Sequence, residues 1–333
     1  MQETFLAAAV QAAPEFLDKQ ATTEKTLRII EDAAARNVRL LAFPETWNPG
    51  YPWWIWLGSP AEGMAYVPEY HANSLVAGEA EDQAIEAAAR KHGMVVVYGL
   101  SEKIGGSLYM SQWIYGPEGL IARRRKLKPT HVERTVFGEG DGSDLQVHDT
   151  PLGRLGALCC WEHLQPLTKY AMFSMNEEVH VASWPSFSVY RGAAHALGPE
   201  VNTAASLMYA AEGQCFVLAP CATVSVAMIE RMCDTEMKKQ FLLPGGGFAR
   251  IYGPDGASLG EDLPETAEGL VLAEINPAMI SIAKSAADPV GHYSRPDVTR
   301  LLLNRKSTPR VMDFADAAEL VGAPVEEVSA EAD

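Results

Sequence analysis

Three neighbouring segments near the start of this 333-residue chain read Phe-Leu-Ala-Ala-Ala-Val (5–10), Thr-Thr-Glu-Lys-Thr-Leu-Arg-Ile-Ile-Glu-Asp-Ala-Ala-Ala-Arg (22–36) and Val-Arg-Leu-Leu-Ala-Phe (38–43). The first and third are short apolar runs typical of buried strands, and Pro44 ends the third. The middle segment places its aliphatic residues at helical spacing. This order of strand, helix and strand predicts an α/β layered fold.

The same alternation continues along the chain. A helix is predicted over 81–92, because Gly93 supplies a C-terminal signal. Further strands are predicted at 95–100, 108–115, 120–125, 155–160, 179–184, 214–218, 248–252 and 270–275. Since no Gly-, Ser- or Pro-rich linker divides the chain, we expect one domain over residues 1–307 and an acidic, loosely held tail over 308–333.

One short motif occurs twice, as Ile-Tyr-Gly-Pro-Glu-Gly at 114–119 and Ile-Tyr-Gly-Pro-Asp-Gly at 251–256. Proline presets φ for the second position of a turn and glycine closes it, so each copy predicts a hairpin at the end of a strand. Either a common turn is used twice, or two similar half-sheets face each other.

Composition narrows the class of protein. With 47% hydrophobic and 21% charged residues the chain is close to the average soluble protein, which excludes disorder, collagen-like fibres and disulfide-rich miniproteins. Lys and Arg number 27 against 43 Asp and Glu, a net charge of −16 that repels polyanions. Nucleic acid is therefore not an expected partner. The one dense basic run, at 123–128, is a local site or a solvated edge strand.

The cysteines and apolar runs indicate the compartment. Five cysteines are an odd number, and Cys159 and Cys160 are adjacent, which favours a reducing environment. The N-terminal segment has no positive start and too short an apolar run for a signal peptide. No stretch reaches the ~18 to 20 apolar residues of a membrane span. We expect a cytoplasmic protein without a membrane partner.

Metal and cofactor motifs are missing from the sequence. It contains no His-Glu-x-x-His and no Cys-x-x-Cys, and Pro-Gly-Gly-Gly at 244–247 lacks the Lys-Ser/Thr of a phosphate loop. The acidic, glycine-containing segment 138–144 lacks the spacing of a calcium loop. We expect no metal and no cofactor.

Three segments end an apolar strand with a reactive side chain: Glu45, Lys126 and Cys160. Open α/β sheets place their chemistry at such ends. Each residue alone is more ordinary, as a surface acid, a solvated lysine and an inert core cysteine. Together they supply a nucleophile, a cation and a carboxylate that moves protons. A helix expected from about Leu164 and the charge of Lys126 should favour the Cys160 thiolate, and His163 is expected to be structural.

These segments resemble, in order, the three signatures of the nitrilase superfamily: Phe-Pro-Glu (43–45), Arg-Arg-Lys-Leu-Lys-Pro-Thr (124–130) and Cys-Trp-Glu (160–162). The resemblance extends from Phe5 to about Asn304. It implies a four-layer α-β-β-α sandwich of the carbon-nitrogen hydrolase type. It also implies site roles, with Glu45 as general base and acid, Lys126 as the cation that stabilises tetrahedral intermediates, Cys160 as nucleophile, and Glu133 as the second glutamate that braces the lysine.

Within the superfamily, Trp161 and the segment 128–144 resemble true nitrilases, most closely bacterial arylacetonitrilases. The aromatic segment 51–56 matches the same branch, and most of it is expected to pack on the core. Substrate contacts are expected from Tyr51, Trp56, Trp161 and Trp184. The implied reaction converts a small nitrile of the arylacetonitrile type to a carboxylic acid and ammonia through a Cys thioimidate and thioester, with some amide by-product.

Other functions stay open at this point. Cyanide hydrolysis, as a dihydratase or hydratase, and aliphatic amidase activity would use the same site, and Trp161 argues against the amidase. A protein of a different class, a non-catalytic assembly protein on this fold, is disfavoured by the complete set of reactive residues. The resemblance also implies a homo-oligomer built from dimers that can extend into a spiral.

Overall fold

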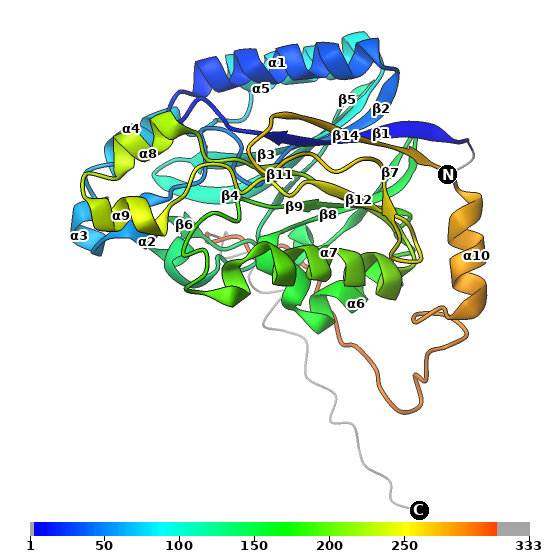
Figure 1. The fold of residues 1–333 in the computed structure, drawn as a ribbon. Coiled ribbons are helices and arrows are strands. Elements are labelled where there is room, and N and C mark those ends of the chain that lie inside the picture. The colour runs from blue at the N-terminus through cyan, green and yellow to red at the C-terminus, as the bar shows by residue number, and fades with distance from the viewer. Residues whose placement is uncertain (1–2, 312–333) are drawn as a thin grey trace, which may run out of the picture.

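The computed structural model describes residues 3–311, and Figure 1 shows two stacked sheets between two helical layers. In the first sheet the order is β11-β1-β2-β3-β4-β5, with β14 beside β1 and β6 beside β4. Its strands are β1 (Phe5–Ala12), β2 (Val38–Ala42), β3 (Val95–Ile104), β4 (Ser107–Gly116), β5 (Gly119–Arg125), β6 (Phe137–Gly138), β11 (Cys221–Ala222) and β14 (Gly269–Ile275).

The second sheet has the order β13-β12-β10-β9-β8-β7. Its strands are β7 (Val147–Thr150), β8 (Gly153–Cys159), β9 (Val179–Ser183), β10 (Phe216–Ala219), β12 (Arg250–Tyr252) and β13 (Ser258–Leu259). The two sheets form the inner layers of the α-β-β-α sandwich that the sequence predicts.

Helices cover the outer faces of both sheets. In Figure 1, α1 (Lys19–Ala35) and α5 (Ala80–His92) lie over the first sheet, and α6 (Pro166–Ser174) and α7 (Pro199–Gly213) lie over the second. The other helices are α2 (Trp54–Leu57), α3 (Pro60–Gly63), α4 (Val67–Asn73), α8 (Val226–Met232), α9 (Glu236–Phe241) and α10 (Ala278–Ala286). Within residues 3–311 there are also four 3₁₀ turns: η1 (His131–Thr135), η2 (Gly142–Asp144), η3 (Cys160–Leu164) and η4 (His195–Leu197).

Strand β1 illustrates why the apolar runs are continuous. Ala7 and Ala9 belong to the core between the two sheets, whereas Ala8 and Val10 belong to the core beneath α1 and α5. Successive side chains of a strand point to opposite faces, so a strand buried on both sides must be apolar at every position. Ile30 of α1 packs in the outer core with no exposed surface, which stabilises the fold by about 1.5–3 kcal/mol.

The repeated turn forms two hairpins, as predicted. The first copy joins β4 to β5 and the second joins β12 to β13, and both strand pairs are antiparallel. Strand β5 is one edge of the first sheet and β13 is one edge of the second. The two copies therefore occupy matching places in the two inner layers.

Several predicted boundaries differ from the structure, such as that of the strand expected at 248–252, which begins at Arg250, and two others differ for identifiable reasons. The helix expected from Leu164 is preceded by the η3 turn and begins at Pro166, because proline fits the first helical position and disfavours a helical residue before it. The strand expected at 214–218 begins at Phe216, since α7 extends to Gly213 and Gln214 ends it in a left-handed conformation with φ 51°.

The ends of the chain add two further observations. Within residues 3–311 no helix is long and apolar enough to cross a bilayer. The predicted division into a domain over 1–307 and a tail over 308–333 stays a prediction, and residues 312–333 of that tail lie outside the described part of the chain. Thr308 itself is held by its backbone N–H, which donates to the Asp141 carboxylate at 2.6 Å.

Candidate active site

The three reactive residues follow strands that end on the same side of the sandwich. Glu45 follows β2, Lys126 follows β5 and Cys160 follows β8. Strand β5 runs parallel to β2, because β2 pairs with β3 in parallel and both the β3–β4 and β4–β5 pairs are antiparallel. One oxygen of each of Glu45 and Glu133 and the sulfur of Cys160 lie within 4.8 Å of one another. The convergence expected from the sequence is therefore present.

Glu45 is carried on a loop that packs tightly against β3. A Cβ added at Gly99 would lie 1.9 Å from the carbonyl oxygen of Pro44, so only glycine permits this approach. The Glu45 backbone N–H donates to the carbonyl of Trp184 at 3.3 Å, across to the loop after β9. The loop is thus fixed from both sheets.

Lys126 lies between two carboxylates and is completely buried. Its Nζ donates to Glu45 Oε1 at 2.9 Å and to Glu133 Oε2 at 2.8 Å. Burial opposes the charge of Lys126, yet the carboxylates of Glu133 and Glu45 together raise its pKa well above its usual value. The ammonium therefore stays protonated and supplies a fixed positive charge in a dry site.

Glu133 connects the lysine to the aromatic segment. It lies in η1, and its Oε2 also accepts the backbone N–H of Thr130 at 2.6 Å. Its other oxygen accepts the hydroxyl of Tyr51 at 2.8 Å, and the indole of Trp56 donates to that hydroxyl at 3.1 Å. Two of the predicted pocket residues are therefore joined to the carboxylate that holds Lys126.

Cys160 sits at a sharp turn between β8 and α6. Its φ of 48° is left-handed, which is strained for a residue with a side chain and is typical of functional sites. Burial and the nearby Glu45 carboxyl raise the pKa of the thiol well above its usual value, and the opposing effects of Lys126 and the Trp161 N–H are smaller. The expectation that the surroundings favour a thiolate is wrong, and the thiol needs a base.

Glu45 has the properties of that base. Burial is the main cause that raises its pKa to about 8, and the attraction of Lys126 offsets this only in part. Its Oε2 is buried and has no hydrogen-bond partner among the described residues. A carboxylate with one oxygen on the lysine and the other unoccupied can accept a proton from a neighbouring thiol.

A small cavity of about 40 Å³ opens in front of Cys160. Its lining includes all four residues predicted to contact substrate: Tyr51, Trp56, Trp161 and Trp184. The indole N–H of Trp161 donates to Asn202 Oδ1 at 2.9 Å, and that of Trp184 donates to Ser206 Oγ at 2.8 Å. Both indoles are thus fixed to α7, and the cavity has a rigid aromatic wall.

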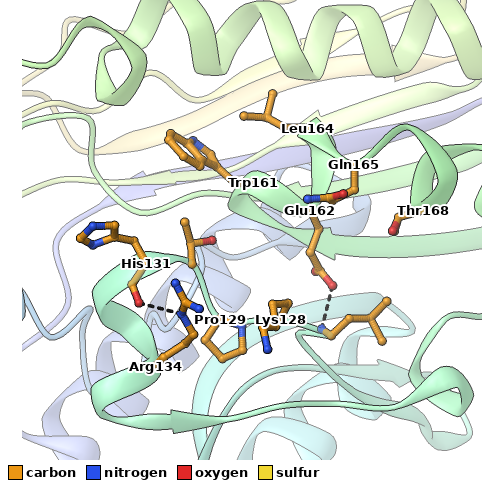
Figure 2. Close-up of a pocket in the computed structure, with 11 residues that line it drawn as sticks. Lys128, Pro129, His131, Arg134, Trp161, Glu162, Leu164, Gln165 and Thr168 are labelled. Atoms are coloured by element: carbon orange, nitrogen blue, oxygen red, sulfur yellow. Dashed lines mark hydrogen bonds between the residues drawn. The ribbon is translucent and has the colours of Figure 1, made fainter.

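A second cavity of about 470 Å³ adjoins the first (Figure 2). It lies between the segment 127–134 and the start of α6, and it shares Thr130 and Trp161 with the aromatic cavity. Although it is larger, neither Cys160 nor Glu133 lines it, whereas both line the aromatic cavity. The chemistry described above therefore belongs to the smaller cavity.

The sequence analysis missed Arg124 and Glu162. The two side chains form a buried pair, with Arg124 donating to both oxygens of Glu162 at 2.8 Å. Glu162 also accepts the backbone N–H groups of Leu127 and Cys159, at 2.9 and 2.7 Å, and Figure 2 draws the bond to Leu127. This carboxylate therefore holds the neighbour of Lys126 and the neighbour of Cys160 at a fixed separation.

A signal for Arg124 was present in the basic run. Side chains alternate between the faces of a strand, so Arg124 and Lys126 share a face that Arg123 and Arg125 do not. The structure shows Arg124 and Lys126 buried, while Arg123 and Arg125 face outward and pair with Asp82 and Glu102. The reading of this run as a solvated edge is wrong for its inward-facing members.

Several other residues that line the cavity were also not predicted, and Trp53 and Asn202 are two of them. Trp53 lies in the aromatic segment 51–56. The pattern of this segment does not show which rings face the core and which face the cavity. Asn202 is on α7, a helix that carries no motif. The sequence offered no signal for Asn202.

Glu45, Glu133 and Cys160 also form a group that could in principle ligate a metal ion. The Lys126 ammonium already bonds both carboxylates of this group. A metal ion at this point would have to displace a buried cation. The donor set therefore fits a lysine-centred site better than a metal site.

Comparison with known proteins assigns the family. The sequence matches the carbon-nitrogen hydrolase family over residues 6–284, and the chain therefore belongs to this family. The carbon-nitrogen hydrolase from Helicobacter pylori G27 superimposes with a TM-score of 0.71, covering 89% of this chain and 97% of that structure at 18% identity. This similarity concerns the fold, and it agrees with the sandwich described above.

Closer relatives define the branch. A nitrilase of Pseudomonas syringae pv. syringae (strain B728a) is 59% identical over 317 residues, covering 95% of this chain and 94% of its own. An aliphatic nitrilase of Rhodococcus rhodochrous is 52% identical over 307 residues, covering 92% and 84%. The arylacetone-specific nitrilase of Alcaligenes faecalis is 50% identical over 299 residues, covering 90% and 84%. The chain belongs to the nitrilase branch of its family.

Proposed function

We propose that the protein is a nitrilase that hydrolyses an arylacetonitrile-like substrate to a carboxylic acid and ammonia. The observation that carries the proposal is the buried cluster in which Lys126 bonds Glu45 and Glu133 within reach of the Cys160 sulfur. The aromatic lining of the cavity suits a substrate with an aryl group. Relatives named as nitrilases, at up to 59% identity, support the same reaction.

In the first half of the reaction, Glu45 takes the proton of the Cys160 thiol and the sulfur attacks the nitrile carbon. The proton passes on to the nitrile nitrogen, which gives a covalent thioimidate. A nucleophile with a high pKa is weak on its own, so an adjacent base is what makes this step possible. The unoccupied Oε2 of Glu45 is the acceptor that we assign to it.

In the second half, a water activated by Glu45 adds to the thioimidate carbon. The tetrahedral species loses ammonia, with Glu45 returning the proton, and leaves a thioester that a second water hydrolyses to the acid and free Cys160. If the tetrahedral species expels the thiol instead, an amide leaves. Lys126 and the Trp161 N–H stabilise the developing negative charge, and one such donor typically contributes ~10²- to 10³-fold in rate.

The decisive test measures ammonia, acid and amide from a panel of phenylacetonitrile, mandelonitrile, cyanide and phenylacetamide. The proposal expects ammonia and acid from the two aryl nitriles, with a minor amide product. Turnover of phenylacetamide alone would identify an amidase instead. A purified protein that turns over none of the four, and shows no imidate or acyl adduct on Cys160 after substrate quench, would be a non-catalytic protein.

One observation favours cyanide as a second candidate substrate. The resting cavity of about 40 Å³ has room for only a few water molecules, so a two-atom substrate enters without any rearrangement. An aryl nitrile needs lining side chains other than the two anchored indoles, such as Leu197, to move as it binds. The cyanide arm of the panel distinguishes the two, because a cyanide-specific enzyme releases ammonia from cyanide but not from phenylacetonitrile.

Enlarging the cavity is expected to widen its substrate range. Leu197 of η4 is a half-buried lining residue, and Leu197→Ala removes part of the wall without touching the reactive groups. One methyl group in an apolar pocket is worth about 10-fold or more in specificity. We expect the kcat/KM ratio of 2-phenylpropionitrile to phenylacetonitrile to rise about 10-fold.

Val298→Ala is the matched control for this measurement, since Val298 is 68% exposed and its loss should leave the ratio unchanged. An unaltered ratio in the Leu197→Ala enzyme would place the aryl group elsewhere. The same pair of steady-state assays serves both variants.

The pKa of Glu45 predicts how activity depends on pH. Glu45 accepts a proton only when ionised, and its pKa is raised to about 8, so kcat/KM should increase as the pH rises through about 8. The rate of Cys160 alkylation by iodoacetamide should show the same inflection, because it reports the same proton transfer without a nitrile. Glu45→Gln should remove the inflection along with the activity. A flat profile across this range would exclude Glu45 as the base.

Two further proposals concern the whole molecule. We propose a homo-oligomer built from dimers, supported by the apolar side chains of Leu164, Leu167 and Met208, which are 41%, 70% and 45% exposed. Light scattering after size-exclusion chromatography tests this, and a monomer contradicts it. We also propose a cytoplasmic location, supported by five buried cysteines that form no disulfide.

A further inference from the structure

A hydrogen-bonded series of four buried polar side chains begins at the Cys160 backbone and lines neither of the two cavities described above. His163 Nδ1 contacts the Cys160 carbonyl oxygen at 2.6 Å, and His163 Nε2 contacts His180 Nε2 at 2.9 Å. His180 Nδ1 contacts Glu177 Oε1 at 2.6 Å, and the Tyr209 hydroxyl donates to Glu177 Oε2 at 2.7 Å. All four side chains are at most 2% exposed. The proposed reaction uses none of them.

The directions of the hydrogen bonds in this series can be worked out from the bond between His163 and the Cys160 carbonyl oxygen. A carbonyl oxygen only accepts, so His163 Nδ1 carries the proton and Nε2 of the neutral ring accepts. His180 must then donate from Nε2, and its Nδ1 accepts. When the His180 ring is neutral, Glu177 must donate to that nitrogen from a protonated carboxyl group, whereas an imidazolium would instead donate to a Glu177 carboxylate. With neutral rings the hydrogen bonds run in one continuous direction from Tyr209 to Cys160.

The electrostatic surroundings agree with neutral groups throughout. Burial raises the pKa of Glu177 to about 8 and lowers the pKa of His163 to about 3. Burial likewise lowers the pKa of His180 well below its usual value. The rings are also locked by packing, since His180 stacks on Tyr209 with centroids 3.8 Å apart, and His163 contacts Trp184 with centroids 5.3 Å apart.

The hydrogen bond from His163 to the Cys160 carbonyl can affect the reaction through the peptide bond between Cys160 and Trp161. The carbonyl of Cys160 and the N–H of Trp161 belong to the same trans peptide bond, so they point in opposite directions. Holding the carbonyl therefore also fixes the direction of the Trp161 N–H, which points the opposite way and interacts with the thiol, lowering the thiol pKa. The same contact fixes Cys160 in its left-handed conformation.

We propose that His163, His180, Glu177 and Tyr209 are positioning residues, which hold the Cys160 carbonyl through a directed hydrogen-bond chain and so orient both the nucleophile and the Trp161 N–H. This inference rests on the proposed function of Cys160. It gives a role to His163 that is neither a base nor mere packing, and it extends the site to α7 and β9.

The first test separates the effect of the hydrogen bonds from the effect of side-chain size and packing. Glu177→Gln preserves every bond, because its amide NH₂ can donate to His180 Nδ1 while its oxygen accepts from Tyr209. Glu177→Leu and His163→Leu break the chain. We expect kcat to stay within about threefold of wild type for Glu177→Gln, and to fall roughly 10- to 100-fold for the two leucine variants with KM little changed.

Ile30→Ala is the matched control for lost stability, because Ile30 is equally buried but lies in the core beneath α1. It should lower Tm without lowering kcat at temperatures well below the transition. The proposal is overturned if His163→Leu and Ile30→Ala have the same kcat at equal Tm loss, or if Glu177→Gln is as damaging as Glu177→Leu.

Two readouts do not depend on nitrile turnover, so they separate this proposal from the proposed function. The infrared difference between wild type and Glu177→Gln should contain the C=O band of a protonated carboxyl group, and carboxylate bands in its place would overturn the chain's direction. Iodoacetamide should alkylate Cys160 more slowly in His163→Leu than in Ile30→Ala, and equal rates would show that the chain does not position the thiol. If both readouts succeed while the nitrile panel shows no turnover, only the proposed function fails.

Discussion

Cys160→Ala is expected to abolish nitrile hydrolysis, with kcat falling by roughly 10⁴-fold or more while the protein folds normally. The proposed reaction passes through two covalent species on this sulfur, and enzymes that lose a covalent nucleophile lose about 10⁶-fold in kcat. The substitution removes a single atom from a side chain that is 9% exposed beside a cavity, so little packing is lost. Ammonia release measures the loss of turnover, and mass spectrometry after substrate quench measures the loss of the covalent adduct.

The adjacent cysteine provides the control. Cys159 is completely buried, does not line the cavity, and places its sulfur 3.9 Å from the guanidinium of Arg124. Cys159→Ala should therefore retain most of the activity and still form the imidate or acyl adduct. An active Cys160→Ala enzyme, or an adduct on Cys159, would remove the assignment of the nucleophile.

Lys126→Met is expected to have the second-largest effect, because it harms both catalysis and folding. The substitution leaves two buried carboxylates without their shared cation, and breaking a buried ion pair in this way typically costs about 3–5 kcal/mol in the free energy of unfolding. Losing a donor to the intermediates should lower kcat by at least ~10²-fold. Urea unfolding and steady-state assays report the two losses separately.

The stability loss should depend on pH in a defined direction. Burial already raises the pKa of Glu45 from 4.5 to about 8, and removal of Lys126 raises it further. The folded variant then binds a proton more tightly than the unfolded chain does, so its stability falls as the pH rises from about 4.5 toward and beyond 8. The destabilisation relative to wild type should be greater at the alkaline end.

A double variant separates charge from chemistry. Lys126→Met with Glu133→Gln removes one of the two stranded charges, so it should regain part of the lost stability and remain inactive. Lys128→Met is the surface control, since this lysine is 62% exposed and pairs only with Glu139 in the described structure. Equal stability of the single and double variants would show that the carboxylates do not depend on Lys126.

The sequence predicted the strands and the convergence of Glu45, Lys126 and Cys160, for a physical reason. A strand buried on both faces must be apolar along its whole length, and its end is visible where a proline or a polar residue stops the run, as at Pro44 after β2. The reactive residues lie directly after such ends. Both hairpins were equally visible, because proline and glycine at fixed offsets leave little choice of turn.

Other features depend on contacts between distant segments and were not predictable. The short helices α2 to α4 show no clear hydrophobic period in the sequence. The packing of their aromatic rings depends on tertiary contacts that the sequence pattern does not reveal. The pairing of Arg124 with Glu162 joins two sheets, and neither residue reveals its partner. The thiol pKa also followed from burial in the assembled site, which outweighed the local effects that the sequence suggested.

The brace formed by Arg124 and Glu162 has one further consequence. It ties the segment after β5 to the segment after β8, so the reactive groups meet only while the two halves of the sandwich stay docked. Local opening needs less free energy than global unfolding, so we expect the reactive groups to separate before the strands of either sheet are lost. A mild denaturant is therefore expected to abolish activity at a concentration at which the circular dichroism spectrum is still that of the native protein. Activity is then the more sensitive measure of whether the two sheets are correctly packed.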